Sequence, residues 1–194
     1  MKISGKHYRT IWPTPSGAVR VIDQSRLPFE FVTVDLESLE DAAHAIRHMT
    51  VRGAPLIGAT AAYGIALALR QDPSDDCLES AARVLKATRP TAQNLAWALA
   101  RMRRALAVVA PRERAEAAYR EAGLICDADV EQCRCIGAHG MEIIRRLAET
   151  TGRRLNILTH CNAGWLACVD WGTALSPIYM AHDAGISIHV WVDE

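Results

Sequence analysis

The chain has 194 residues, of which 50% are hydrophobic and 23% are charged. It is therefore long enough to bury a sizeable core and has the composition of a soluble globular protein. Lys plus Arg and Asp plus Glu both number 22. This balance argues against a general nucleic-acid-binding protein and against binding to an anionic membrane, because both need excess positive charge.

Targeting signals and cysteine usage predict the compartment. The opening sequence, MKISGKHYRTIWPTPSG, contains no apolar segment of the kind that a secretory signal carries. The longest uncharged apolar stretch, 54–69, is shorter than the roughly 20 residues that cross a bilayer. Six cysteines without such a signal indicate free thiols. We therefore expect a cytoplasmic protein that contacts no membrane.

The first elements in chain order are short β-strands. Apolar residues bounded by Pro and Gly predict strands at 7–12, 18–23 and 29–35. The sequence Ser-Leu-Glu-Asp at 38–41 is typical of a capping box, and it predicts a helix that ends near Met49. These elements predict a small β-meander followed by helices.

The middle of the chain is predicted to be helical. The stretch 55–70 is apolar on all sides and begins with Pro55, which is favoured at the first position of a helix. Ala, Leu, Arg and Glu at helical spacing then predict four more helices, at about 76–87, 92–109, 112–125 and 128–150.

The pattern changes after Thr151–Arg154. A strand at 155–159, a turn, a helix within 173–185 and a second strand at 186–192 form a predicted βαβ unit, which opens a parallel sheet. Two strands do not make a self-sufficient parallel sheet, because both faces and both edges need covering. We therefore expect a fragment of a longer protein, inactive and prone to aggregation when alone.

The predicted fold class is α/β. Residues 1–126 would form an α+β domain with a β-meander and a helical bundle. Residues 127–194 would form a linker helix and the first βαβ unit of a Rossmann-like domain that is incomplete.

Cys161 is the first candidate for chemistry. It follows a predicted strand in "ILTHCNAGWLA", and ligands bind beyond the carboxyl ends of parallel strands. A helix beginning just after it, or a protonated histidine beside it, would favour the thiolate form. The alternative is that Cys161 is a small buried apolar side chain, as most free cysteines are. Position alone leaves both interpretations open.

A metal site is the competing interpretation of the cysteines. Tetrahedral zinc sites usually contain closely spaced pairs, and no Cys-x-x-Cys pair occurs in the chain. The histidines His139, His182 and His189 fall on predicted helix or strand faces, where ordinary core or surface roles suffice. The sequence therefore predicts no metal ligands.

Two arginines precede predicted helices and form a second candidate site. Arg52, Gly53 and Ala54 lead into the apolar helix, where free backbone N–H groups and the helix dipole attract anions. Arg89 precedes Pro90 and another helix in the same way. A phosphate-bearing ligand fits this arrangement, although both arginines could equally be surface cations.

The segments "TVRGAPLIGATAAYGIALAL", "RPTAQNLAWAL" and "ILTHCNAGWLACVDWGTAL" together resemble the methylthioribose-1-phosphate isomerases of methionine salvage. This family is related to regulatory subunits of an initiation-factor exchange factor and to ribose-1,5-bisphosphate isomerases. The resemblance extends from about Trp12 to the last residue. It implies a β-meander and helical domain, then a Rossmann-like domain, with the active site between them.

The resemblance also implies residue roles. Cys161 matches the family's catalytic cysteine, which the regulatory relatives generally lack. Arg52, Gly53 and Ala54 match its substrate-binding Arg-Gly-Ala, and Arg89 matches a further substrate-binding arginine. The family's catalytic aspartate lies downstream of the last residue of this chain.

The implied reaction is the conversion of 5-methylthioribose 1-phosphate, a phosphosugar, to its ketose. It would need no cofactor or metal, and the protein would be a homodimer. One rival is an isomerase of ribose 1,5-bisphosphate, against which the apolar Trp165 and Trp171 weakly favour a thioether substrate. The other is a regulatory subunit without catalysis.

Overall fold

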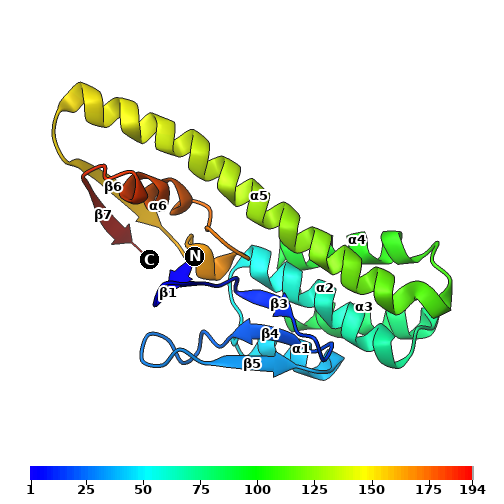
Figure 1. The fold of residues 1–194 in the computed structure, drawn as a ribbon. Helices are drawn as coiled ribbons and strands as arrows, with labels where there is room; N and C mark the ends of the chain where they lie inside the picture. The colour runs from blue at the N-terminus through cyan, green and yellow to red at the C-terminus, as the bar shows by residue number, and fades with distance from the viewer. Residues whose placement is uncertain (194) are drawn as a thin grey trace.

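The computed structural model describes residues 1–193, and its longest element is the helix α5. Figure 1 shows α5 reaching from a helical bundle at one end of the molecule to a small parallel sheet at the other. The β-meander lies beside the bundle, and the amino terminus lies near the parallel sheet.

The β-meander is antiparallel and has the strand order β3–β4–β5. Its strands are β3 (Ile11–Pro13), β4 (Val19–Ile22) and β5 (Thr33–Leu36). The central strand β4 is the most deeply buried of the three, since Val19, Val21 and Ile22 are all fully covered. The meander is therefore part of the main core.

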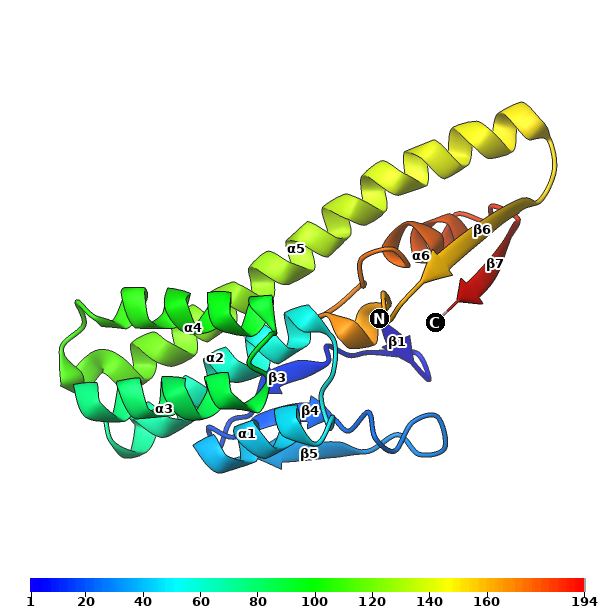
Figure 2. The ribbon, with the colours of Figure 1, turned by 180° about the vertical axis from the view of Figure 1, so that it is seen from behind.

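The helix α2 (Ala54–Gln71) is the centre of the bundle, and every residue from Leu56 to Leu69 is buried. Its neighbours are α1 (Leu39–Arg47), α3 (Asp75–Thr88), α4 (Gln93–Leu106) and α5 (Pro111–Thr151). Figure 2, seen from behind, shows α3 and α4 beside α2. The predicted capping box is confirmed, because Ser38 and Asp41 bond reciprocally at the start of α1.

The prediction of two helices at 112–125 and 128–150 is wrong, since α5 is a single helix of 41 residues. Nothing between Ile125 and Ala128 breaks it, because neither Gly nor Pro occurs there. Asp127, which could have capped a new helix, instead pairs with Arg9 at 2.7 Å. The proposed boundary between residues 126 and 127 lies within α5, and the division into two domains stays a prediction.

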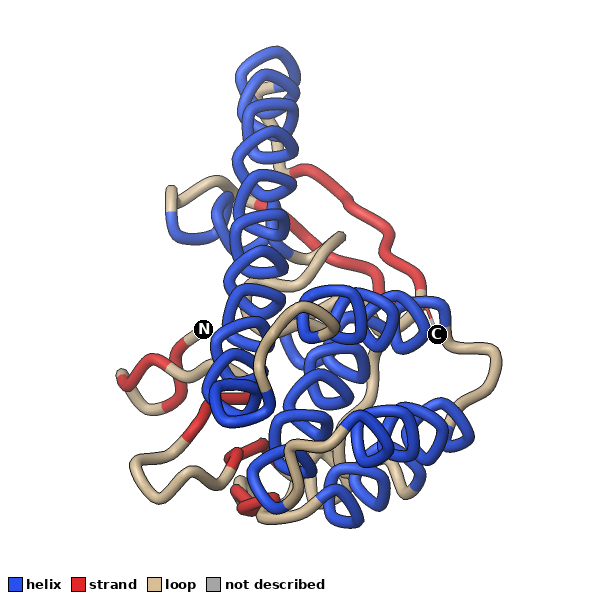
Figure 3. Tube along the Cα trace, turned by 90° about the vertical axis from the view of Figure 1, so that its right-hand side faces the viewer, coloured by secondary structure: helices blue, strands red, loops and turns tan. Residues whose placement is uncertain are grey.

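The βαβ unit is confirmed. Strands β6 (Leu155–His160) and β7 (Ile188–Asp193) pair in parallel, and α6 (Ser176–Asp183) connects them. Figure 3 shows the two strands beside the upper part of α5. A short 3₁₀ helix, η1 (Trp165–Ala167), precedes α6. The sheet exposes apolar side chains, namely Leu158, Trp191 and Val192.

Two strand predictions need correction. A hairpin of β1 (Lys2–Ile3) and β2 (Lys6–His7) precedes the meander and was not predicted, so the strand expected at 7–12 is two separate elements. The strand expected at 29–35 begins only at Thr33. Residues 24–32 form a loop, closed where the Asp23 N–H donates to the Val32 carbonyl at 2.9 Å, and Phe29 is 92% exposed. Within residues 1–193, no helix combines the length and apolar character needed to cross a membrane.

Candidate active site

Cys161 lies directly after β6 and is exposed to solvent. Its backbone is left-handed, with φ of +68°, which is uncommon for any residue other than glycine. The Cys161 N–H donates to the Asp193 carbonyl at 3.1 Å, so the turn is fixed to the end of β7. Cys161 lines a cavity of about 220 Å³ whose other walls include Asn162, Tyr179 and Val192. Strained backbone at the mouth of a cavity is typical of functional positions.

The helix expected just after Cys161 is absent at that position. The next α-helix, α6, begins only at Ser176, and the short η1 lies between it and Cys161. The intervening loop is held in a turn because the Ala163 carbonyl accepts the Thr173 N–H at 3.0 Å. Gly172 makes the turn possible, since a Cβ there would lie 2.4 Å from the Gly164 carbonyl carbon.

The Arg-Gly-Ala loop packs directly against η1. Gly53 has φ of +98° and precedes α2, and a Cβ there would lie 2.3 Å from the Ala167 Cα. Only glycine allows the two backbones to approach so closely. The structure thus brings the Arg52 loop next to the segment that follows Cys161.

Gln24 bonds to both of these segments. Its backbone N–H donates to the Thr50 carbonyl at 2.9 Å, and its side-chain amide donates to the Leu166 carbonyl at 2.6 Å. Gln24 is 8% exposed. It therefore fixes the Arg52 loop relative to η1, a role that no local sequence signal indicates.

Arg89 caps the end of α3 and is half-buried, whereas Arg52 is exposed. The start of α4, which follows Arg89, packs on the first turns of α2, since a Cβ at Gly58 would lie 2.9 Å from the Asn94 carbonyl oxygen. Neither Arg52 nor Arg89 has an ion-pair partner within the 1–193 range that the structure describes. Both guanidinium groups are free to bind an anion.

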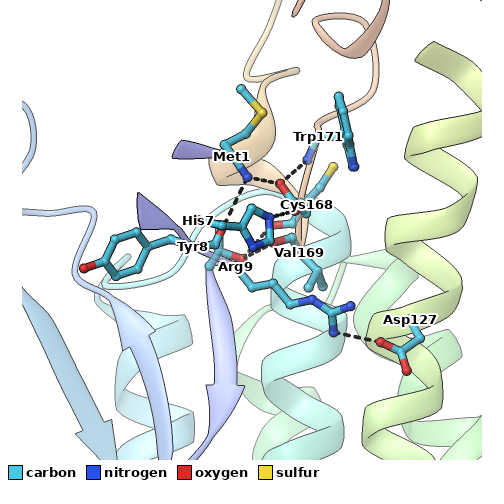
Figure 4. Close-up of polar contacts among 10 residues, drawn as sticks. Met1, His7, Tyr8, Arg9, Asp127, Cys168, Val169 and Trp171 are labelled. Atoms are coloured by element: carbon cyan, nitrogen blue, oxygen red, sulfur yellow. Dashed lines mark hydrogen bonds and ion pairs between the residues drawn. The ribbon is translucent and has the colours of Figure 1, made fainter. Parts of the chain in front are cut away.

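The segment 168–170 is clamped between the amino-terminal strands and α5 (Figure 4). Thr10 donates its backbone N–H to the Val169 carbonyl at 3.0 Å and its hydroxyl to the Cys168 carbonyl at 2.6 Å. From the other side, the Asp129 carboxylate on α5 accepts the Val169 N–H at 2.7 Å. These bonds fix the position of η1, against which Gly53 packs.

Asp170 is a buried carboxylate whose partners come from the amino-terminal hairpin. It pairs with the amino group of Met1 and lies 2.6 Å from the His7 Nε2, and it also accepts the Trp171 N–H at 2.8 Å. Figure 4 shows these groups converging on one point. The side chain of Asp170 is only 4% exposed.

Replacing Asp170 with alanine is expected to lower the free energy of unfolding by about 1–3 kcal/mol, because it removes a buried carboxylate together with its bonds to Met1, His7 and the Trp171 N–H. Urea denaturation followed by circular dichroism measures this change. The matched control is Asp35→Ala, which breaks the exposed pair with Arg20 and should change stability far less. Equal losses in the two variants would show that the Asp170 cluster is not specially stabilising.

A second group of polar side chains lies beside this clamp. The ligand-type atoms of Asp129, Cys133 and Cys168 all lie within 4.8 Å of one another. Hydrogen bonding with Cys133 and burial raise the pKa of the Cys168 thiol, and burial raises the pKa of the Asp129 carboxyl. Asp129 and Cys133 are four residues apart on α5, a spacing that places them on one face. Sequence reasoning missed the group because Cys168 joins it only through the fold.

Comparison with known proteins assigns the family. Residues 50–194 match the Initiation factor 2 subunit family. The chain belongs to this family. Curated members named methylthioribose-1-phosphate isomerase align with all of the chain, at 61% identity in Rhodospirillum centenum and 62% in Methylobacterium nodulans. The chain spans about half the length of these relatives, 52% and 53% respectively.

Solved structures of the family share the fold. The crystal structure of 5-methylthioribose 1-phosphate isomerase from Pyrococcus horikoshii OT3 matches with a TM-score of 0.83 and 37% identity over 96% of this chain and 52% of its own. Translation initiation factor eIF-2B, subunit delta, from A. fulgidus matches with a TM-score of 0.80 and 36% identity over 96% of this chain and 54% of its own. The fold class and the resemblance to the isomerases are confirmed, but the fold alone does not separate the two kinds of relative.

Proposed function

We propose that this chain is the amino-terminal part of an enzyme that isomerises 5-methylthioribose 1-phosphate to 5-methylthioribulose 1-phosphate in methionine salvage. The observation that carries the proposal is the contact between Gly53 and Ala167. It joins the Arg52 loop, matched to the substrate-binding loop of the isomerases, to the segment that follows Cys161, matched to their catalytic cysteine. Identity of about 60% to curated isomerases over the whole chain supports the same assignment.

The residues suit the chemistry of this substrate. The phosphorylated anomeric oxygen prevents the ring from opening as a free sugar does, so hydrogen must move from C2 to C1 with the help of an acid and a base or by a direct shift. Arg52 and Arg89 would bind the phosphate and fix the sugar over Cys161. The isomerisation is redox-neutral overall, so it needs no external oxidant or reductant, and the resemblance to the isomerases implies that turnover needs neither a metal nor an organic cofactor.

Replacing Arg52 or Arg89 with glutamine is expected to raise KM for the phosphosugar by roughly 10- to 100-fold, because each removes a charge-assisted hydrogen bond to the phosphate. Steady-state kinetics on the chain extended to the length of its relatives measures this. Arg120→Gln on α5 is the control, since Arg120 is exposed like Arg52 and lies outside the proposed site. A KM unchanged by both substitutions would contradict phosphate binding by these arginines.

Two rival functions remain for the same fold. An isomerase of ribose 1,5-bisphosphate would need a second phosphate site, whereas the cavity beside Cys161 has Trp165, Leu175 and Tyr179 in its walls. These largely apolar side chains suit the methylthio group of 5-methylthioribose 1-phosphate better than they suit a second phosphate. A regulatory subunit without catalysis is suggested by the match to eIF-2B subunit delta.

The two substrates, offered separately to the extended chain, distinguish the three functions. We expect turnover of 5-methylthioribose 1-phosphate to exceed that of ribose 1,5-bisphosphate by at least about a hundredfold, since placing a second phosphate among apolar side chains is costly. The reverse preference would assign the bisphosphate isomerase. Binding without turnover of either sugar would assign the regulatory function.

The remaining properties of the protein belong to the same proposal. We expect a cytoplasmic homodimer in which residues 127–194 open a Rossmann-like domain. The exposed apolar side chains of β6 and β7, namely Leu158, Trp191 and Val192, would be covered by the further half that the relatives possess.

A further inference from the structure

Three potential metal ligands converge where the end of η1 meets α5. Asp129 and Cys133 project from one face of α5, and Cys168 comes from the residue after η1. Their donor atoms lie within 4.8 Å of one another, and both cysteines are 1% exposed. Two thiols and a carboxylate gathered in a buried place are a donor set that soft divalent cations prefer.

The spacing of the atoms suits a tetrahedral ion. Bonds of about 2.3 Å from zinc to sulfur and about 2.0 Å to a carboxylate oxygen separate neighbouring ligand atoms by roughly 3.5–3.8 Å. The Cys133 Sγ and the Asp129 Oδ1 lie 4.0 Å apart. Small side-chain adjustments would therefore bring the donors to bonding distance.

The carboxylate of Asp129 is already oriented for this role. Its Oδ2 accepts the Val169 N–H at 2.7 Å, while its Oδ1 is the oxygen that faces Cys133. A backbone N–H that holds one oxygen and turns the other toward an ion is the usual outer support of a metal-binding carboxylate. One oxygen of Asp129 thus holds the Val169 backbone, and the other faces the Cys133 thiol.

A neighbouring cavity touches the group at Asp129. Asp129 lines a cavity of about 240 Å³ between α2, α4 and α5, together with Gly58, Asn94 and Trp97. This volume exceeds the roughly 30 Å³ that one water occupies in the liquid. It leaves room beside Asp129 for a water as the fourth ligand of an ion.

We propose that Asp129, Cys133 and Cys168 bind one zinc ion, or a soft divalent cation of the same ligand preference, that fastens the segment 168–170 to α5. The ion is structural. It would hold η1 and, through the contact between Ala167 and Gly53, the Arg52 loop, and it takes no part in the isomerisation. Binding would release the thiol protons.

The test uses the chain extended to the length of its relatives and purified without chelators. Elemental analysis is expected to find close to one zinc per chain, and replacement by Co²⁺ should give the intense near-ultraviolet absorption of a thiolate–cobalt bond. Cys133→Ala and Cys168→Ala should abolish that absorption. Cys126→Ala is the matched control, because Cys126 is equally buried on α5 but lies outside the group, and it should leave the absorption unchanged.

Asp129→Asn covers the case in which the cysteine variants do not fold, because it keeps both thiols and nearly the same shape. It should weaken Co²⁺ binding by about 10- to 100-fold. Reduced, folded protein that contains no bound metal and gives no cobalt absorption would overturn the proposal. So would a purified chain two hydrogen atoms lighter, with Cys133 and Cys168 joined as a disulfide.

Discussion

Replacing Cys161 with alanine is expected to lower kcat for 5-methylthioribose 1-phosphate by at least about a hundredfold, since groups that act directly on the reacting atoms contribute 10² or more. The change in KM should be small, because phosphate binding by Arg52 and Arg89 is retained. The measurement is a steady-state assay on the extended chain. Cys135→Ala, which removes a partly exposed thiol on α5, serves as the control and should retain full activity.

The left-handed backbone at Cys161 allows catalysis to be separated from folding. Because residue 161 has φ of +68°, glycine fits there with less strain than alanine. The free energy of unfolding of Cys161→Gly should therefore be about 1 kcal/mol higher than that of Cys161→Ala, while both variants remain inactive. A loss of activity below tenfold in the two folded variants would count strongly against a catalytic role for the thiol.

Replacing Gly53 with alanine is expected to lower the free energy of unfolding by about 2–5 kcal/mol. The new Cβ would lie 2.3 Å from the Ala167 Cα, and the residue would keep φ of +98°. Backbone strain contributes about 1–2 kcal/mol, and overpacking contributes about 1–3 kcal/mol more. Denaturant unfolding of the extended chain measures the sum, and catalytic activity should fall with it because the Arg52 loop must move away from η1.

Gly152→Ala is the control, because it adds backbone strain without a close contact. Gly152 ends α5 in a left-handed conformation, with φ of +60°, but among residues 1–193 no neighbouring atom lies within 4 Å of the position its Cβ would take. This variant should lose only the strain contribution of about 1 kcal/mol and should retain activity. Equal losses of unfolding free energy in Gly53→Ala and Gly152→Ala would show that Gly53 and Ala167 are not closely packed.

Elements specified by local signals could be predicted from the sequence. The apolar run of α2, the capping box of α1 and the strand–helix–strand rhythm of β6, α6 and β7 each depend on neighbouring residues, and all are confirmed. The break predicted within α5 was wrong because helix propensity near Cys126 and Asp127 is weak but not prohibitive, and packing against α2 sustains the helix. The helix expected directly after Cys161 is absent, because the Thr173 N–H donates to the Ala163 carbonyl and holds the chain in a turn there.

The candidate site shows the same division. Cys161, Arg52 and Arg89 were predicted from motifs and family resemblance, and their roles stay predictions, although the structure brings the Gly53 loop against the segment that follows Cys161. Gln24, Asp170 and the group of Asp129, Cys133 and Cys168 were missed. Their partners lie far apart in the chain, so only the folded structure brings them together.

The most direct test of the account mixes the extended chain with 5-methylthioribose 1-phosphate and follows formation of the ketose by NMR, beside a Cys161→Ser variant that has the same circular dichroism spectrum. We predict conversion by the unaltered protein and none by the variant over the same time. A folded protein that binds the phosphosugar but forms no ketose would contradict the account and favour a regulatory subunit.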